Sequence, residues 1–191
     1  MKKFLVFIFM VVLFVVVFGA GFYLLDYIVT GEKLSNLEEH EISKKEEEKI
    51  IKEFQYNDMD FVISKYYDDT SAWSHLRIMR KARGNYYILQ DVKKCDVLEN
   101  GENIFVKDKN IYVHCIGKEE EIGIYTVDGF SVSEKLVNYN FKKTPNISLV
   151  HMKVDKVDDK YIYLSSEKVD LAIDEGEHVK CPLDGYVCSY D

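Results

Sequence analysis

Prolines and flexible linkers are scarce in this sequence. Its 191 residues include two prolines and ten glycines, and they contain no Pro-, Gly- or Ser-rich tract and no internal repeat. The absence of repeats excludes a solenoid or propeller array, and the absence of linkers argues against several tethered domains. We therefore expect the roughly 160 residues beyond the N-terminal segment to form one domain with its own core.

The common catalytic motifs are also missing. The sequence contains no HExxH, GxSxG, Walker or GxGxxG pattern, and no CxxC or CxxCH pair. These absences argue against zinc hydrolysis, serine hydrolysis, nucleotide binding, thioredoxin-like redox chemistry and attached haem. We expect no cofactor, and the sequence favours a protein that is not an enzyme.

Basic residues are outnumbered by acidic ones. The chain has 25 lysines and arginines against 33 aspartates and glutamates, which gives a net charge of −8. An acidic protein is repelled by the phosphates of nucleic acid, so we expect no nucleic-acid partner.

Charged side chains are absent from one long segment near the N-terminus, the run Phe4 to Leu25. As a helix it would span roughly 33 Å, enough to cross the hydrocarbon core of a bilayer. The sequence therefore predicts a transmembrane helix, with the lipid bilayer as partner of residues 4–25. Lys2 and Lys3 precede the run and only Lys33 follows it closely. The positive-inside rule then predicts a single-pass plasma-membrane protein with a cytoplasmic N-terminus and an extracytoplasmic C-terminal part.

A cleaved signal peptide is the alternative for this segment. Its only candidate cleavage site, VFGAG, puts the bulky Phe18 where a small residue belongs, and the apolar run continues beyond it. The sequence favours a retained signal-anchor, and a protein secreted after cleavage is the alternative.

Three regions follow from these patterns. They are a cytoplasmic tip and transmembrane signal-anchor over residues 1–30, a charged juxtamembrane helix or stalk over 31–56, and an extracytoplasmic β-rich domain over 57–191. A capping-box pattern at Ser43 and Glu46 starts the expected juxtamembrane helix near Lys44. A coiled-coil stalk is the alternative, and the apolar spacing breaks within it.

Four cations crowd together in the next part of the chain, namely Arg77, Arg80, Lys81 and Arg83. Their segment fits a short helix that ends at Gly84 or a hairpin that turns there, and the sequence slightly favours the helix. On an acidic protein the four could form a patch that contacts lipid phosphates or an anionic polymer. A solvated basic face is the simpler interpretation.

Short runs rich in Val, Ile, Tyr and Phe, separated by turn signals, make up the chain from Tyr86 onward. One hairpin is expected to turn at residues 107–110, with Ile111 and Val113 on one face of its second strand and Tyr112 on the other. The strand spacing predicts an α+β protein dominated by β structure. After the transmembrane and juxtamembrane helices we expect a compact antiparallel β-barrel or sandwich.

Two histidines are the best candidates for chemistry. His114 and His151 each fall in a predicted strand, on the less apolar face. If the two strands were neighbours, the imidazoles could work as an acid–base pair, so an extracytoplasmic hydrolase using His114 and His151 is our alternative function. Strand tyrosines such as Tyr161 and Tyr163 could instead form an exposed aromatic row that binds a glycan or a protein.

Four cysteines, Cys95, Cys115, Cys181 and Cys188, allow three disulfide pairings. Their spacing lacks the close pairs of structural zinc sites, so we expect no metal site. If Asp184-Gly185 is the type I′ turn of a hairpin, Cys181 and Cys188 stand opposite each other, and this is the first disulfide that we predict. Cys95 with Cys115 is the second.

The segment Glu175 to Val187, EGEHVKCPLDGYV, resembles the hairpin turn of biotinyl/lipoyl-type domains and of membrane-fusion adaptor proteins. The Met-Lys carrier turn of those families is missing, so the resemblance implies a shared hairpin and no function.

The apolar anchor, the acidic strand-rich domain and the missing catalytic motifs predict a single-pass membrane-anchored extracytoplasmic protein. Its β-rich domain would bind or assist another envelope component, a protein or a glycan, without catalysis.

Overall fold

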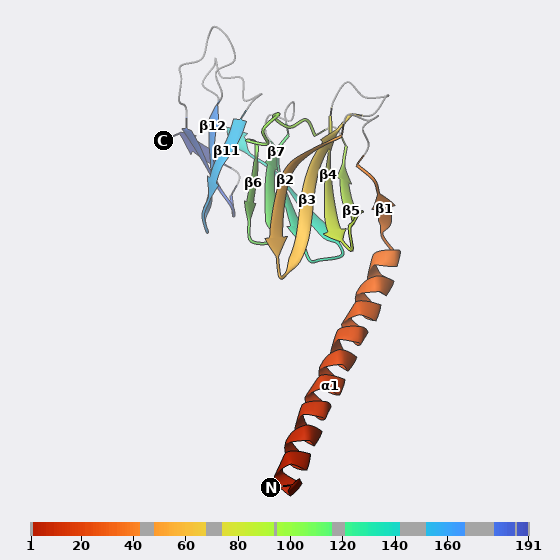
Figure 1. Cartoon of the computed structure of the whole chain (residues 1–191). Coiled ribbons are helices and arrows are strands. Elements are labelled where there is room, and N and C mark those ends of the chain that lie inside the picture. The colour runs from red at the N-terminus through yellow and green to blue at the C-terminus, as the bar shows by residue number, and fades with distance from the viewer. Residues whose placement is uncertain are drawn as a thin grey trace. The chain divides into compact units, whose positions relative to one another are not determined.

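The computed structural model describes residues 2–42, 48–67, 74–93, 95–115, 121–141, 152–166, 178–185 and 187–190. The chain divides into two compact units, residues 1–38 and 39–191. Over the described ranges the first unit is dominated by one long helix, and the second consists of strands (Figure 1).

The helix α1 (Lys2–Ser35) contains the apolar run. Its side chains are apolar on every side and exposed between Phe7 and Leu25. A helix without a polar face has no side to turn toward water, and an apolar environment suits it best. By length and composition α1 is able to cross a membrane, a property that a retained anchor and a signal sequence share.

The second unit is built from three sheets, and their strand order decides which edges are free. The first sheet contains β1 (Glu38–His40), which begins at the boundary of the two units, β2 (Lys49–Tyr56), β3 (Met59–Tyr66), β4 (His75–Ala82) and β5 (Asn85–Val92), in the order β1-β5-β4-β3-β2. The second contains β6 (Ile104–Lys107), β7 (Asn110–His114), β8 (Glu121–Val127) and β9 (Val132–Asn138), in that order. The third contains β10 (Asn140–Phe141), β11 (Met152–Val157), β12 (Tyr161–Ser166), β13 (His178–Pro182) and β14 (Val187–Tyr190), in the order β10-β14-β13-β12-β11.

The sheets are antiparallel, apart from the parallel pair β10 and β14. The described residues therefore confirm a β-dominated body, and they close none of the three sheets into a barrel.

The second sheet contributes to two cores, because side chains alternate between its faces. Ile111 and Val113 pack with Phe61 of the first sheet. Tyr112, between them in sequence, belongs instead to the core with Ile162 of the third sheet. The face assignment predicted for β7 is thus confirmed, and so is its turn, since Lys107 pairs with Asn110.

Two tight turns fix the hairpins of the first sheet. Asn57 and Asp58 have φ values of 49° and 57°, and Arg83 and Gly84 have 53° and 84°. Two successive left-handed residues are the mark of a type I′ turn, whose twist matches that of the strands it joins. The turn at Arg83-Gly84 therefore continues β4 directly into β5.

The helices predicted outside α1 are wrong where the structure describes those residues. Residues 49–56, expected to end the juxtamembrane helix, form β2, and residues 75–82 form β4, so the hairpin alternative is correct. The reason is tertiary: Phe54 pairs with Phe61 across the sheet, with ring centroids 5.2 Å apart, and such packing overrides local helix propensity. The capping box at Ser43 and Glu46 lies outside the described residues.

Candidate functional site

Both predicted disulfides are present, with Cα–Cα distances of 4.7 Å for Cys95–Cys115 and 4.2 Å for Cys181–Cys188. The ladder that pairs Lys180 with Ser189 places Cys181 opposite Cys188, as the sequence predicts. The type I′ turn at Asp184-Gly185 is wrong, because neither residue has a positive φ. Gly185 meets a steric need instead, since a Cβ there would lie 2.8 Å from the ring of Pro182.

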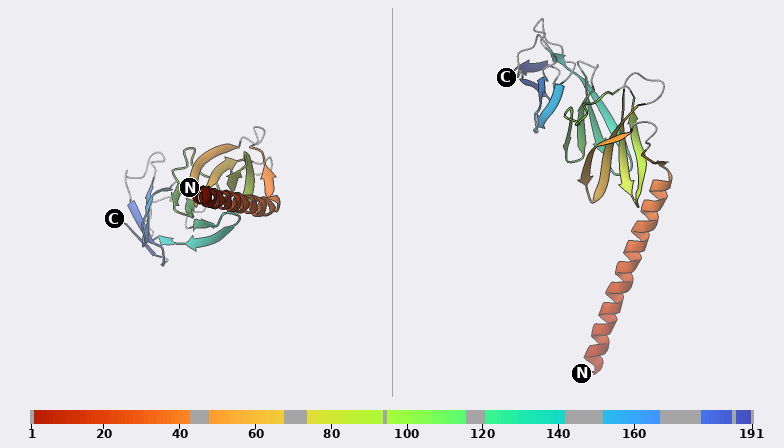
Figure 2. Two further views of the ribbon diagram at one scale, coloured as in Figure 1. Left: turned by 60° about the horizontal axis from the view of Figure 1, so that its bottom comes forward. Right: turned by 45° about the horizontal axis from the view of Figure 1, so that its top comes forward.

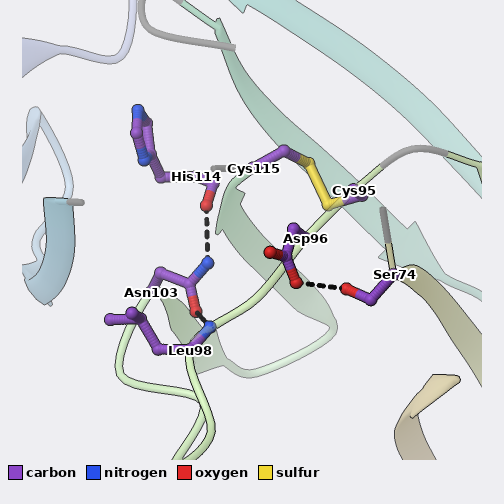
Figure 3. Close-up of a disulfide and its surroundings, with 7 residues drawn as sticks. All are labelled: Ser74, Cys95, Asp96, Leu98, Asn103, His114 and Cys115. Atoms are coloured by element: carbon purple, nitrogen blue, oxygen red, sulfur yellow. Dashed lines mark hydrogen bonds between the residues drawn. A yellow bond between two sulfur atoms is a disulfide. The ribbon is translucent and has the colours of Figure 1, made fainter. Parts of the chain in front are cut away.

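A hydrogen-bonded loop surrounds the Cys95–Cys115 disulfide (Figure 3). The Asn103 side chain donates to the carbonyl of His114 over 2.7 Å and accepts from the amide of Leu98 over 2.9 Å. Nearby, the Ser74 hydroxyl donates to Asp96. These bonds tie the loop after Cys95 to the end of β7, and they give this region a structural role.

The structure describes one of the two histidines proposed for catalysis. His114 is fully buried in the body of the protein, and His151 lies outside the described residues. Within the described ranges, no three His, Cys, Asp or Glu side chains are grouped so as to hold a metal ion. A buried imidazole is out of reach of a substrate in solution, so this geometry gives the hydrolase alternative no support.

The four predicted cations do not form one surface. Arg77 and Arg80 are each only 7% exposed and lie on opposite faces of β4. Arg80 donates to the carbonyl of Gly129 over 2.9 Å, with its guanidinium 4.2 Å above the ring of Phe130. Lys81 and Arg83 are exposed. Contact of these two with an anion stays a prediction.

Arg77 belongs to a buried charge cluster on the face of the first sheet that points away from its core. It lies 3.2 Å from Glu48, whose side chain is fully buried, and 3.5 Å from Asp91. Glu48 also accepts a hydrogen bond from Ser64 over 2.6 Å and contacts His40 over 2.6 Å. The Arg77 cation is paired with two carboxylates, which indicates a structural cluster.

The electrostatics of Glu48 agree with that role. Burial raises the pKa of its carboxyl, but the hydrogen bonds from Ser64 and His40 and the charges of His40 and Arg77 outweigh burial. The pKa therefore lies below the ordinary value of 4.5, and the carboxylate form is the one that the fold stabilises.

Strand β9 is the exposed end of the second sheet. It pairs with β8 on one side, and on the other side no strand neighbours it in the described part of the chain. In the left view of Figure 2 it runs, in teal, along the outer margin of this sheet. Ser133, Glu134, Lys135 and Leu136 are all exposed, and Leu136 is 45% exposed although it is apolar. Such an edge is available to a further strand.

Other long edges are occupied. On β2, the Lys52 ammonium donates to the carbonyl of Ile104, on β6, over 2.8 Å. On β11, the amide of Val154 donates to the carbonyl of Glu102 over 3.0 Å. The terminal strands β1 and β10 have only three and two residues. Among the described residues, β9 therefore combines length with an uncovered edge.

A groove adjoins the β9 edge. It has a volume of about 280 Å³ and is bordered by Lys135, Leu136 and Val137 on one side and by residues 183–185 on the other. Leu136 and Leu183 give it apolar walls, and Lys135 and Asp184 give it charge of both signs. The groove is large enough for one or two side chains of a bound segment.

Comparison of the chain with protein-family models, with curated proteins and with solved structures finds no match. The function must therefore be inferred from the signals of location and from the surfaces of the molecule.

The predicted aromatic row is largely inside the protein, where Tyr112, Tyr125 and Tyr139 are buried. Tyr161 and Tyr163 lie side by side on the third sheet, with the Lys180 ammonium 4.0 Å above the ring of Tyr161. Sequence reasoning did not single out β9. Its sequence, VSEKLVN, places adjacent charges within a strand pattern, which is typical of edge strands and is the signal that could have found it.

Proposed function

We propose that this protein is anchored in the plasma membrane by α1, with its N-terminus in the cytoplasm, and that its sandwich-like β body binds another component of the cell envelope without catalysis. The observation that carries the proposal is the combination of an apolar, exposed α1 with two disulfides in the body that follows it. Disulfides persist in oxidising compartments, so their presence supports export of the body across the membrane that α1 would cross.

Binding is favoured over catalysis by the surfaces of the body. His114, one of the two histidines proposed for catalysis, is buried, whereas β9 offers a backbone edge uncovered by any described strand, with an exposed apolar side chain, Leu136. Exposed strand edges of this kind serve recognition of extended segments of other proteins.

Topology is tested by cysteine labelling of intact cells with a membrane-impermeant maleimide. A cysteine at the exposed turn residue Lys160 (Lys160→Cys) is expected to react on intact cells. A cysteine inserted after Met1 is expected to react only after lysis. The reverse pattern, or protection of both positions, would overturn the proposed orientation. A mature chain that begins beyond Ala20 would show cleavage and secretion instead.

Binding is tested with an impermeant cross-linker on intact cells. The full chain is expected to give a cross-linked species that a chain ending at residue 42, which keeps α1, does not give. The purified partner must then bind the full chain directly in detergent. Identical products from the long and the short chain would contradict a binding role for the β body.

A further inference from the structure

We propose that the free edge of β9 binds an extended peptide segment of another protein, which joins the second sheet as an additional antiparallel strand. The inference rests on the proposed function, and it names the site and the chemistry of the partner.

The backbone of β9 is set up for such an addition. The amide of Asp128 donates to the carbonyl of Ser131, and the β8–β9 register continues from this pair. In an antiparallel ladder bonded and non-bonded pairs alternate, so Ser133 and Lys135 bond to β8 while Glu134 and Leu136 direct their amide and carbonyl groups outward. Outward groups in a row are the donors and acceptors that an added strand uses.

The side chains of β9 indicate which residues an added strand would place opposite them. Leu136 is exposed beside the groove that residues 183–185 border, so an apolar side chain of the added strand is expected there. Glu134 and Lys135 lie next to each other on opposite faces, and opposite charges placed directly across from them are stabilising. The partner strand therefore carries an apolar residue, an acidic residue and a basic residue in succession.

A second copy of this chain is a poor occupant of the same edge. Two β9 strands related by a twofold axis must pair residues of the same face, so one residue always faces its own counterpart. The register that uses the whole strand places Lys135 opposite Lys135 of the other copy, and a shift of one position places either Glu134 opposite Glu134 or Leu136 opposite Leu136. Like charges directly opposite destabilise the first two registers, and the third gives Glu134 and Lys135 no opposite charge, which favours a partner of different sequence.

The test uses a labelled synthetic peptide, Thr-Thr-Leu-Glu-Lys-Thr-Val, and the full chain in lipid nanodiscs. In an antiparallel pairing its Leu lies opposite Leu136, its Glu opposite Lys135 and its Lys opposite Glu134. A matched peptide with Lys in place of Glu is the control. By fluorescence anisotropy we expect the first peptide to bind about twofold to fivefold more tightly than the second. Hydrogen exchange is expected to slow at the amides of Glu134 and Leu136.

Charge reversal provides the decisive comparison. The variant Lys135→Glu is expected to prefer the control peptide, in which Lys replaces Glu, whereas Lys160→Glu, at the exposed turn between β11 and β12, is expected to keep the wild-type preference. Leu136→Pro removes an outward amide and no bond to β8, so this variant should stay folded and lose peptide binding.

Three results would overturn the inference: no binding of either peptide, an unchanged preference in Lys135→Glu, or a chain that dimerises through β9 in nanodiscs. A failure of this inference can be told apart from a failure of the proposed function. If the Leu136→Pro variant still cross-links to the same partner on intact cells, the β body binds that partner through another surface. If the cysteine of Lys160→Cys is labelled only after lysis, the proposed extracytoplasmic location of the β body is wrong, whether or not the peptides bind.

Discussion

The Arg77 guanidinium lies 3.2 Å from the Glu48 carboxylate on the outer face of the first sheet, and the Glu48 side chain is fully buried. Arg77 stands in the middle of β4, whereas Glu48 directly precedes β2, two strands away in the sheet. The pair therefore fixes the start of β2 against the centre of the sheet. Because Asp91 and the ring of Tyr66 also contact Arg77, its side chain is held from several sides.

Loss of Arg77 is expected to be strongly destabilising. The substitution Arg77→Ala removes the guanidinium from the buried carboxylate of Glu48, and breaking a buried ion pair in this way typically costs about 3–5 kcal/mol. The matched control is Lys81→Ala, on the same strand but exposed, for which a change within about 0.5 kcal/mol is expected. Urea unfolding of the full chain in detergent, followed by circular dichroism, measures both. Equal effects of the two substitutions would contradict a structural role for the cluster.

Glu48 is expected to make the β body sensitive to acid. Its folded pKa lies below the ordinary value of 4.5, so its contribution to stability is fully present above that value and is lost as the pH falls through the folded pKa. The substitution Glu48→Gln should therefore flatten the decline of unfolding free energy below pH 4.5. Lys81→Ala, which removes no carboxyl group, is the control and should keep the slope of the wild type in urea unfolding across this pH range.

Features that depend on neighbouring residues could be predicted from the sequence. The turn at residues 107–110 and the opposition of Cys181 and Cys188 follow from strand alternation and turn position, and the structure has both, although the turn at Asp184-Gly185 is not of type I′. The long apolar run is recognised by composition alone. Local physics fixes these features, because each one involves residues a few positions apart.

Features that depend on sheet order could not be predicted. The apolar spacing of residues 49–56 suits a helix as well as a strand, and only the pairing with β3 decides between them. From the sequence alone Arg77 is interpreted as a surface cation, because the sequence does not show that the fold brings Glu48 next to it. Likewise, β9 is an edge because β8 is its one neighbour among the described strands of the second sheet, and a single sequence does not show this strand order.

The two disulfides are expected to differ in their contribution to stability. Cys95 and Cys115 are separated by 20 positions, and Cys181 and Cys188 by 7. Loop-closure entropy then gives about 3 kcal/mol for the first and about 2 kcal/mol for the second. The paired variants Cys95→Ala with Cys115→Ala and Cys181→Ala with Cys188→Ala, compared by urea unfolding, test the order. A larger loss from the short hairpin would show that packing of its buried cysteines outweighs chain entropy.

Gly123 is expected to be intolerant of even one added carbon. A Cβ at this position would lie 2.6 Å from the ring of Tyr125, a side chain that is only 1% exposed and packs in the core. We expect Gly123→Ala to cost about 1–3 kcal/mol, as overpacking of a core does.

The cause is tested by a double-mutant cycle with Tyr125→Leu. If the clash with the ring is responsible, Gly123→Ala should cost less in the Tyr125→Leu background than in the wild type, because the aromatic ring is gone. The difference between the two backgrounds, measured by urea unfolding, is the coupling between the residues. Equal costs in both backgrounds would mean that the backbone of β8, and not the Tyr125 ring, requires glycine at this position.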